Sequence, residues 1–162
     1  MIRLYEKEDR KAIENIVSFG LNTNSSSLAH LSDTLERDLN RFDRYAETKW
    51  PMFNEQYWVC VVDGEVIGGI GITKIQRQPM ESKEMVCLHR LSIDSNYRRM
   101  GYASLLLQYL ETYVKNQKIR RIRLTTQEDL IPAIHFYNSH GYKCVGKKKW
   151  EKLVLLTYEK II

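Results

Sequence analysis

The segment that most restricts the fold is EMVCLHRLSIDSNYRRMGYASLLLQYLETYV, residues 84–114. It starts as a long apolar strand over 84–93, passes through a short turn at 94–97 and continues as an amphipathic helix. Two arginines and a glycine lie at the start of this helix, where the macrodipole disfavours cations. We therefore expect an anionic ligand at this end of the helix.

The turn itself has the chemistry of a phosphate site. Arg98, Gly101 and Ala103 form the pattern R-x-x-G-x-A. The N–H groups of a helix start can bind phosphate oxygens, glycine lets the backbone approach a ligand closely, and arginine supplies counter-charge. The pattern differs from GxGxxG and from GxxxxGK[ST], so another phosphate loop is predicted. From these residues alone, a positive solvated turn tightened by glycine is the alternative.

The other patterns predict a mixed α/β sheet packed with helices. The expected strands lie at 2–5, on both sides of Asp63-Gly64 within 57–75, at 84–93, at 119–125, at 142–146 and at 150–160. The expected helices run from Asp9 to Gly20, from Leu28 to a point before Pro51, over about 102–114, and from Pro132 to Gly141. We find no repeat and no domain boundary, so residues 1–162 are predicted to form one domain.

Composition restricts the class of protein. The chain has 162 residues, of which 43% are hydrophobic and 28% charged, as in a soluble globular domain. It lacks the run of roughly 18 apolar residues that a membrane span needs, and its N-terminus MIRLYEKEDRK is charged where a signal peptide is apolar. Cys60, Cys87 and Cys144 are odd in number and without metal-ligand spacing. These features predict a reduced, cytoplasmic protein without a metal or a membrane partner.

The net charge of +5 and the pI of about 9.1 would permit nucleic-acid binding. The charge gathers at 98–99, at 118–123 and at 147–149, and we interpret the last cluster as a solvated surface turn. A nucleic-acid binder needs basic residues interleaved with exposed aromatics along one face. Because the first cluster already serves an anionic ligand, we expect no nucleic-acid partner.

Three motifs together resemble the GNAT superfamily of acetyltransferases. LHRLSIDSNYRRMGYASLLL, residues 88–107, resembles the family's strand, [RQ]-x-x-G-x-[GA] turn and helix. AIHFYNSHGYKCVG, residues 133–146, resembles its A-x-x-x-Y followed by a Gly-aromatic pair, and WVCVVDGEVIGGIGI, residues 58–72, resembles its central hairpin. The resemblance implies the GNAT fold, a mixed, mostly antiparallel six- to seven-stranded sheet with a splayed parallel pair, flanked by about four helices.

The resemblance also implies an enzyme that moves an acetyl group from acetyl-CoA to a primary amine by direct attack. In such a protein the backbone of Leu91, Ser92 and Ile93 would bind the pantetheine arm of the cofactor. The pyrophosphate would lie on the loop and helix start, which here comprise Arg98, Arg99, Met100, Gly101, Tyr102, Ala103 and Ser104.

The resemblance assigns Tyr137 as the donor to the departing sulfur, with a packing tyrosine as the alternative. Glu84, at the start of the long strand, is the expected general base. His89 is another candidate base, although a structural histidine is the more common case. Relatives that acetylate protein N-termini often carry a glutamate where this chain has Thr125, which weakens that role here.

One departure from the family concerns Leu130, where many relatives carry an asparagine that contacts the pantetheine arm. Gln127 or Asp129 is a candidate replacement, and weaker CoA binding is the alternative. The departure also leaves open a non-catalytic CoA-binding sensor or interaction module as the second functional hypothesis.

The acceptor is expected to be a small-molecule or peptide amine. In this family residues 22–56 and 76–83 would form the variable wall of the site, and the acidic and aromatic side chains of the first segment suit a small cationic amine. Solvated charges on an amphipathic helix are the alternative for the first of these segments. A homodimer through the C-terminal strands is a further expectation of the resemblance, because 150–158 is apolar.

Overall fold

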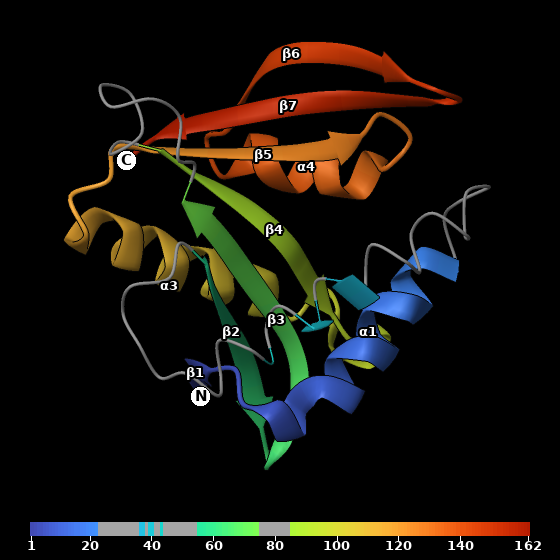
Figure 1. Ribbon diagram of the computed structural model, residues 1–162, viewed down its shortest axis with the longest axis vertical. Helices are drawn as coiled ribbons and strands as arrows, with labels where there is room; N and C mark the ends of the chain where they lie inside the picture. The colour runs from blue at the N-terminus through green and yellow to red at the C-terminus, as the bar shows by residue number, and fades with distance from the viewer. Residues whose placement is uncertain (23–35, 38, 41–42, 44–54, 75–84) are drawn as a thin grey trace. The chain divides into compact units, whose positions relative to one another are not determined.

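The computed structural model describes residues 1–22, 36–37, 39–40, 43, 55–74 and 85–162 (Figure 1). The strands are β1 (Ile2–Leu4), β2 (Glu55–Val62), β3 (Glu65–Lys74), β4 (Met85–Ile93), β5 (Arg121–Gln127), β6 (Lys143–Trp150) and β7 (Leu153–Ile161). The α-helices are α1 (Arg10–Asn22), α3 (Tyr102–Asn116) and α4 (Ile131–Ser139), and short 3-10 turns occur at η1 (Lys7–Asp9) and η2 (Ser95–Tyr97).

The seven strands form one sheet in the order β1-β2-β3-β4-β5-β7-β6. Strand β4 pairs with β5 in parallel, whereas β1–β2, β5–β7 and β6–β7 are antiparallel. The predicted fold class and its parallel pair are therefore confirmed. The helix predicted from Leu28 toward Pro51 lies mostly outside the described residues. Those described within it are helical, namely Glu36, Arg37, Leu39, Asn40 and Asp43.

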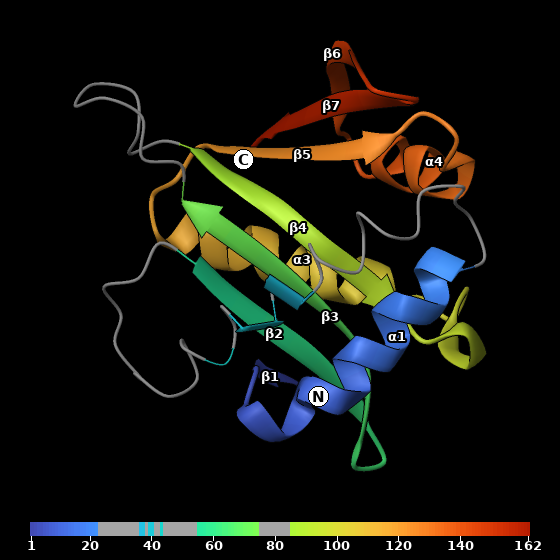
Figure 2. The same cartoon turned by 45° about the vertical axis from the view of Figure 1, so that its right-hand side comes forward.

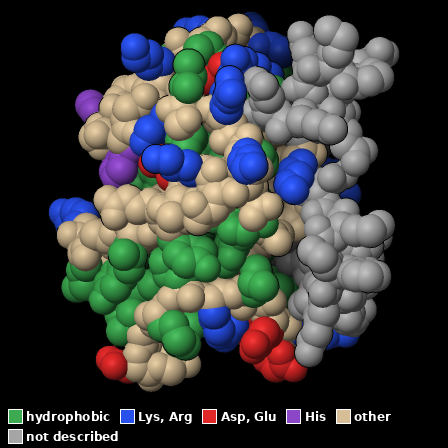
Figure 3. All heavy atoms as spheres, turned by 90° about the vertical axis from the view of Figure 1, so that its left-hand side faces the viewer, with side chains coloured by type: hydrophobic (Ala, Val, Ile, Leu, Met, Phe, Trp, Pro, Cys, Tyr) green, Lys and Arg blue, Asp and Glu red, His purple; other side chains and the backbone are tan. Residues whose placement is uncertain are grey.

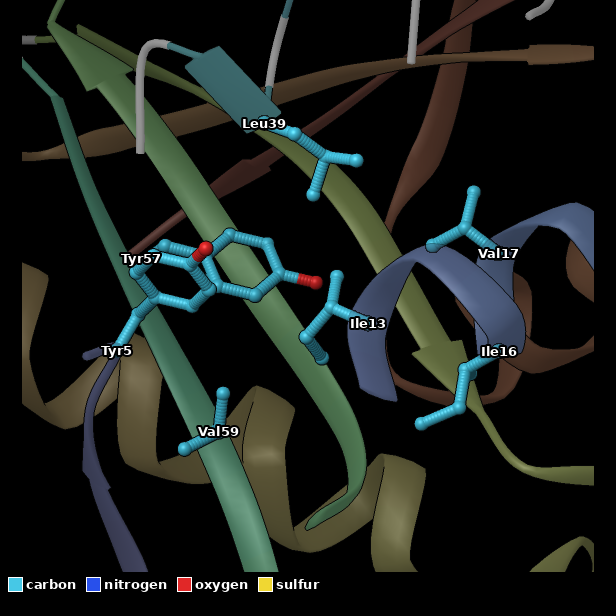
Figure 4. Packing of buried hydrophobic residues seen from close by; sticks show 7 residues of the cluster. All are labelled: Tyr5, Ile13, Ile16, Val17, Leu39, Tyr57 and Val59. Atoms are coloured by element: carbon cyan, nitrogen blue, oxygen red, sulfur yellow. The ribbon is translucent and has the colours of Figure 1, made fainter. Parts of the chain in front are cut away.

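The described chain divides into two compact units, and the first comprises Met1–Ile72 and Arg90–Glu111. Within it, helices α1 and α3 lie on opposite faces of β2 and β3 (Figures 1 and 2). Strand β2 can pack against a helix on each face, because successive side chains of a strand point to opposite faces. Tyr57 and Val59 pack with Ile13 and Ile16 of α1 (Figure 4). Trp58 points the other way and meets Tyr109 of α3, with ring centroids 6.1 Å apart.

Tyr57 organises the centre of this first unit. Its ring meets the Tyr5 ring edge-on, with centroids 5.9 Å apart, and its hydroxyl donates to the Arg90 carbonyl at 3.2 Å. A Cβ at Gly69 would lie 2.5 Å from the Tyr57 ring, so a larger residue there would displace the ring. The glycine thus lets a core tyrosine reach the backbone of β4.

The second unit comprises Thr73–His89 and Thr112–Ile162. Along β5, Ile122 and Leu124 are buried on one face, and Tyr158 of the neighbouring β7 is buried beside them. Tyr137 of α4 and Tyr142 just after the helix are also buried, and their rings meet with centroids 5.7 Å apart. Apolar and aromatic side chains from β5, β7 and α4 therefore form the core of this unit.

The hairpin of β6 and β7 differs from the prediction at its turn. Lys147–Lys149, interpreted from the sequence as a solvated turn, lie within β6 and pair with Leu156, Leu155 and Val154 of β7. The turn comes after Trp150 instead, where Glu151 has a φ of +53°. The interpretation as a turn was wrong because every residue of this strand except Gly146 is exposed, so β6 carries no apolar alternation.

Candidate functional site

The end of β4 has an irregular backbone that the packing of the first unit holds in place. Arg90 adopts a φ of +53°, which is uncommon outside glycine. The Tyr57 hydroxyl binds its carbonyl. The residues after Arg90 lie close to β3. A Cβ at Gly68 of β3 would lie 2.5 Å from the Ser92 carbonyl oxygen, so β3 approaches Leu91–Ile93 closely. This is the stretch predicted to bind the pantetheine arm.

The pairing of β4 with β5 is short. Its register covers Met85↔Arg121, Val86↔Ile122 and Cys87↔Arg123, and both strands continue beyond these pairs, β4 to Ile93 and β5 to Gln127. A parallel pair that ends this early leaves backbone groups available to a ligand that binds like an added strand. The parallel pair expected from the sequence has this register.

The turn after β4 is anchored at both ends. The Asp94 N–H donates to the Ile67 carbonyl of β3 at 2.8 Å, and the Asp94 side chain accepts from the Asn96 N–H at 2.9 Å. Arg98 Nε donates to the Ile93 carbonyl at 3.1 Å. Arg98 therefore fixes the exit of β4 as well as adding charge, a role that the sequence pattern did not suggest.

The backbone of the loop is suited to an anion. Arg99 and Gly101 both have positive φ, at +62° and +88°, and α3 then starts at Tyr102. Its first helical hydrogen bond runs from Leu105 N to Gly101 O at 3.0 Å, so the amides of Tyr102 and Ala103 project from the helix end. Loops of this kind turn successive N–H groups toward one anion.

Gly101 also satisfies the steric requirement for a bulky phosphate group. A Cβ at this position would meet no heavy atom of the described residues within 4 Å, so this part of the chain leaves space directly in front of the loop. Arg98, Arg99 and Met100 are exposed, and Met100 has 65% of its surface accessible. The residues present therefore fit a pyrophosphate with arginine counter-charge.

The surface charge is divided among several places. On the face in Figure 3, Lys and Arg side chains gather in the upper half, and acidic side chains lie among them. Ion pairs among the described residues include Arg123–Glu159 and Lys147–Glu128. Part of the positive charge of the 25 Lys and Arg residues is thus paired locally with carboxylates.

Tyr137 lies on α4 in the second unit, and its side chain is held by aromatic neighbours. Its ring meets those of Phe136 and Tyr142 edge-on, with centroids 5.4 Å and 5.7 Å away, and only 8% of the residue is accessible. Burial raises the pKa of the Tyr137 phenol well above its ordinary value. The group is therefore protonated at neutral pH and can donate a hydrogen bond.

The turn between β5 and α4 carries the departure from the family pattern. Leu130 is the residue before α4 and gives the helix no side-chain cap. Nearby, Gln127 Oε1 is buried and accepts no hydrogen bond from the residues that the structure describes. A buried carbonyl oxygen without a donor is costly, so it suits an N–H group brought by a ligand. Asp129 is exposed by contrast.

The structure describes only one of the two candidate bases. Glu84 lies outside the described residues. His89 Nε2 lies 3.0 Å from Thr73 Oγ1, and both residues belong to the second unit. Thr125, on β5, is exposed. The structure thus brings residues 91–104 together in the first unit and places Tyr137 and His89 in the second.

The His, Cys, Asp and Glu side chains of the described residues form no group of three or more suited to a metal ion. None of the helices in this part of the chain combines the length and apolar character required to cross a membrane.

Comparison with known sequences gives a consistent result. The sequence profile of the acetyltransferase (GNAT) family matches residues 27–142. N-acetylaspartate synthetase of Xenopus tropicalis is 32% identical over 119 residues, which cover 74% of this chain and 41% of that protein. L-amino acid N-acetyltransferase AaaT of Escherichia coli (strain K12) is 32% identical over 92 residues, which cover 56% of this chain and 55% of that protein. The chain thus spans about half the length of these relatives.

Solved structures agree with the topology. A GNAT-family acetyltransferase from Streptococcus pneumoniae superposes with a TM-score of 0.72 at 25% identity, covering 100% of this chain and 99% of that one. The yncA protein of Salmonella typhimurium, solved with its cofactor acetyl-CoA, superposes with a TM-score of 0.75 at 14% identity and covers 99% of this chain and 92% of that one. The second likeness concerns the fold alone.

Proposed function

The chain belongs to the acetyltransferase (GNAT) family, and from this premise we propose that it transfers the acetyl group of acetyl-CoA to a primary amine. The observation that carries the proposal is the loop before α3, where Arg99 and Gly101 have positive φ and the arginines flank projecting amides. Such a loop binds a pyrophosphate through backbone donors and guanidinium charge. In this proposal residues 1–162 act as one domain.

Each part of the first unit has a separate role. The amides from Arg99 to Ala103, with the Ser104 hydroxyl, bind the phosphates. Arg98 keeps Nε on the Ile93 carbonyl and turns its other N–H groups to the same anion. The backbone of Leu91, Ser92 and Ile93, held by the contacts of Tyr57 and Gly68, binds the pantetheine arm.

Acetyl-CoA supplies an activated acetyl group on a sulfur that leaves as a thiolate. Tyr137 donates a hydrogen bond from its buried, protonated phenol to that sulfur. The amine must lose a proton before it attacks, since an ordinary ammonium has a pKa near 10. Glu84 is the proposed acceptor of that proton, and His89, oriented by Thr73, is the second candidate.

The acceptor class has support from the relatives. N-acetylaspartate synthetase is named for an N-acetylated amino acid, and L-amino acid N-acetyltransferase AaaT is named for amino-acid acceptors. We therefore include amino acids among the acceptors, beside small amines and protein amines. We also place the protein in the reducing cytoplasm, because Cys60, Cys87 and Cys144 carry free thiols.

The experiment that tests this function combines titration calorimetry with a free-thiol assay. We expect micromolar-range binding of acetyl-CoA and thiol release that depends on an added amine, measured across a panel of primary amines. Binding without release on any amine would support a sensor or interaction module instead. No binding would refute the phosphate loop.

A further prediction concerns Gln127. If its buried Oε1 accepts an N–H from the pantetheine arm, Gln127→Ala should raise the Kd for acetyl-CoA about 5- to 10-fold, the cost of one lost hydrogen bond. Leu130→Asn in this variant should recover the affinity, and the melting temperature should rise because asparagine caps α4. Calorimetry and thermal unfolding measure both effects.

Gln56→Ala is the matched control for this prediction. Gln56 lies on β2 and also has a buried Oε1 that accepts no hydrogen bond from the described residues. Its loss should leave the Kd unchanged. An equal Kd in Gln127→Ala and the wild type would assign Gln127 no part in binding the cofactor.

A further inference from the structure

A second polar cluster lies on the sheet of the second unit, on the face opposite the aromatic core. Alternation along β5 buries Ile122 and Leu124 on one face and places Arg121 and Arg123 on the other. The register pairs Arg123 with Glu159 of β7. It also pairs Glu159 with Lys143 of β6. The four charged residues that share this face are therefore Arg121, Arg123, Lys143 and Glu159. We call this set the arginine face.

The arginine face is not neutral among its described residues. Arg123 Nε donates to Glu159 Oε1 at 2.7 Å, and Arg121 Nη1 lies 3.8 Å from Glu159 Oε2. One carboxylate is thus shared by two guanidinium groups, with Lys143 as a third cation in the register. The excess positive charge favours an anionic ligand.

Exposure separates the cations from the carboxylate. The side chains of Arg121 and Arg123 are 48% and 32% accessible, whereas that of Glu159 is only 16% accessible. A guanidinium has five N–H donors, and Arg123 uses its Nε and one terminal nitrogen on Glu159. Donors therefore remain for a planar carboxylate, the group that arginine binds best. A solvent-exposed ion pair by itself adds little stability, so it would not require two arginines.

The position of Arg123 relates this face to the proposed chemistry. Arg123 pairs with Cys87 in the last registered pair of β4 and β5. Two residues further along each strand, on the same face, lie Thr125 and His89. Two residues of a strand span about 6.6 Å, which is the scale of a small amine that carries its own carboxylate. The face thus joins a carboxylate-binding group to a candidate base within one unit.

We propose that Arg121 and Arg123 bind a carboxylate of the acceptor, so that the acceptor is an amine bearing a carboxylate, as in free amino acids. This inference rests on the acetyl transfer proposed above. It differs from the small cationic amine expected from residues 22–56, most of which lie outside the described residues. Glu159 orients the guanidinium of Arg123 and competes with the ligand for it.

The test uses the thiol-release assay with saturating acetyl-CoA. It compares each free L-amino acid with its α-carboxamide, and it compares aspartate with asparagine. The wild type should prefer carboxylate acceptors in kcat/KM. Arg121→Gln and Arg123→Gln should each raise KM for them about 10- to 100-fold, as for a lost charge-assisted hydrogen bond, and remove the preference. The Kd of acetyl-CoA should not change.

Two variants separate this role from a structural ion pair. Glu159→Gln should lower KM for carboxylate acceptors, because it removes the competing anion, whereas a purely structural pair would give only lower thermal stability. Arg120→Gln removes an equal charge just before β5 and should change neither KM nor the preference. The inference would be overturned if the wild type preferred carboxamides to carboxylate acceptors. It would also be overturned if the arginine variants kept the wild-type preference for carboxylate acceptors. Thiol release on no amine would instead overturn the proposed function.

Discussion

Gly101→Glu is expected to abolish acetyl-CoA binding, with the Kd raised by more than about 100-fold because two unfavourable effects coincide. The substitution places a side chain where a φ of +88° favours glycine, and that side chain enters the open space in front of the loop. It also brings a carboxylate to the loop proposed to bind phosphate, where it would repel the phosphate and compete for Arg98 and Arg99. Titration calorimetry measures the loss directly.

Gly64→Glu is a close control for backbone strain. Gly64 has a φ of +85°, and a Cβ there also meets no atom of the described chain within 4 Å, yet it lies in the turn between β2 and β3. Both variants should therefore lose a similar amount of thermal stability, while only Gly101→Glu loses binding. If Gly101→Glu kept the wild-type Kd, the loop before α3 would not be the phosphate site.

Local patterns in the sequence predicted the parts of the fold that depend on near neighbours. Asp63-Gly64 predicts a hairpin turn because few residues tolerate the two positive φ values that such a turn needs, and both residues adopt them. The strand, turn and helix over 84–114 likewise follow from apolar periodicity and from the glycine at 101. The residues assigned to the site were all placed by this pattern or by the family resemblance.

Long-range contacts could not be predicted from the sequence. The hydrogen bond from Tyr57 to the Arg90 carbonyl joins residues 33 positions apart, and it requires Gly69 to leave space for the ring. The Gly68-Gly69 pair was a visible signal, since glycine inside a strand often marks a close backbone approach, but it did not say which backbone approaches. The arginine face needed the β5–β7 register, because Arg123 and Glu159 are 36 positions apart.

The second large effect is expected at Tyr137. Tyr137→Phe removes only the hydroxyl and keeps the ring that packs on Phe136 and Tyr142. If the phenol donates to the departing sulfur, kcat should fall about 100-fold, the lower range for a lost general acid. The Kd of acetyl-CoA and the melting temperature should stay close to those of the wild type.

The pH dependence adds an independent test of the same role. Because burial raises the pKa of the Tyr137 phenol, the protonated form is the one that the fold favours, and it persists as the pH rises past the ordinary tyrosine value near 10. The wild-type kcat should therefore show no alkaline loss from this group between neutral pH and about pH 10. A kcat that fell with an ordinary tyrosine pKa would mean that the catalytic phenol is a different and more exposed one.

Tyr142→Phe is the control that separates the loss of the Tyr137 hydroxyl from the loss of any hydroxyl in this aromatic cluster. Tyr142 is buried like Tyr137, with 2% against 8% of its surface accessible, and the two rings meet edge-on, so the two variants lose the same group from the same aromatic cluster. Only Tyr137→Phe should lower kcat strongly, since only Tyr137 is assigned to the sulfur. Equal kcat values in Tyr137→Phe and the wild type would leave Tyr137 as a packing residue, and equal losses in both variants would attribute the effect to the cluster as a whole.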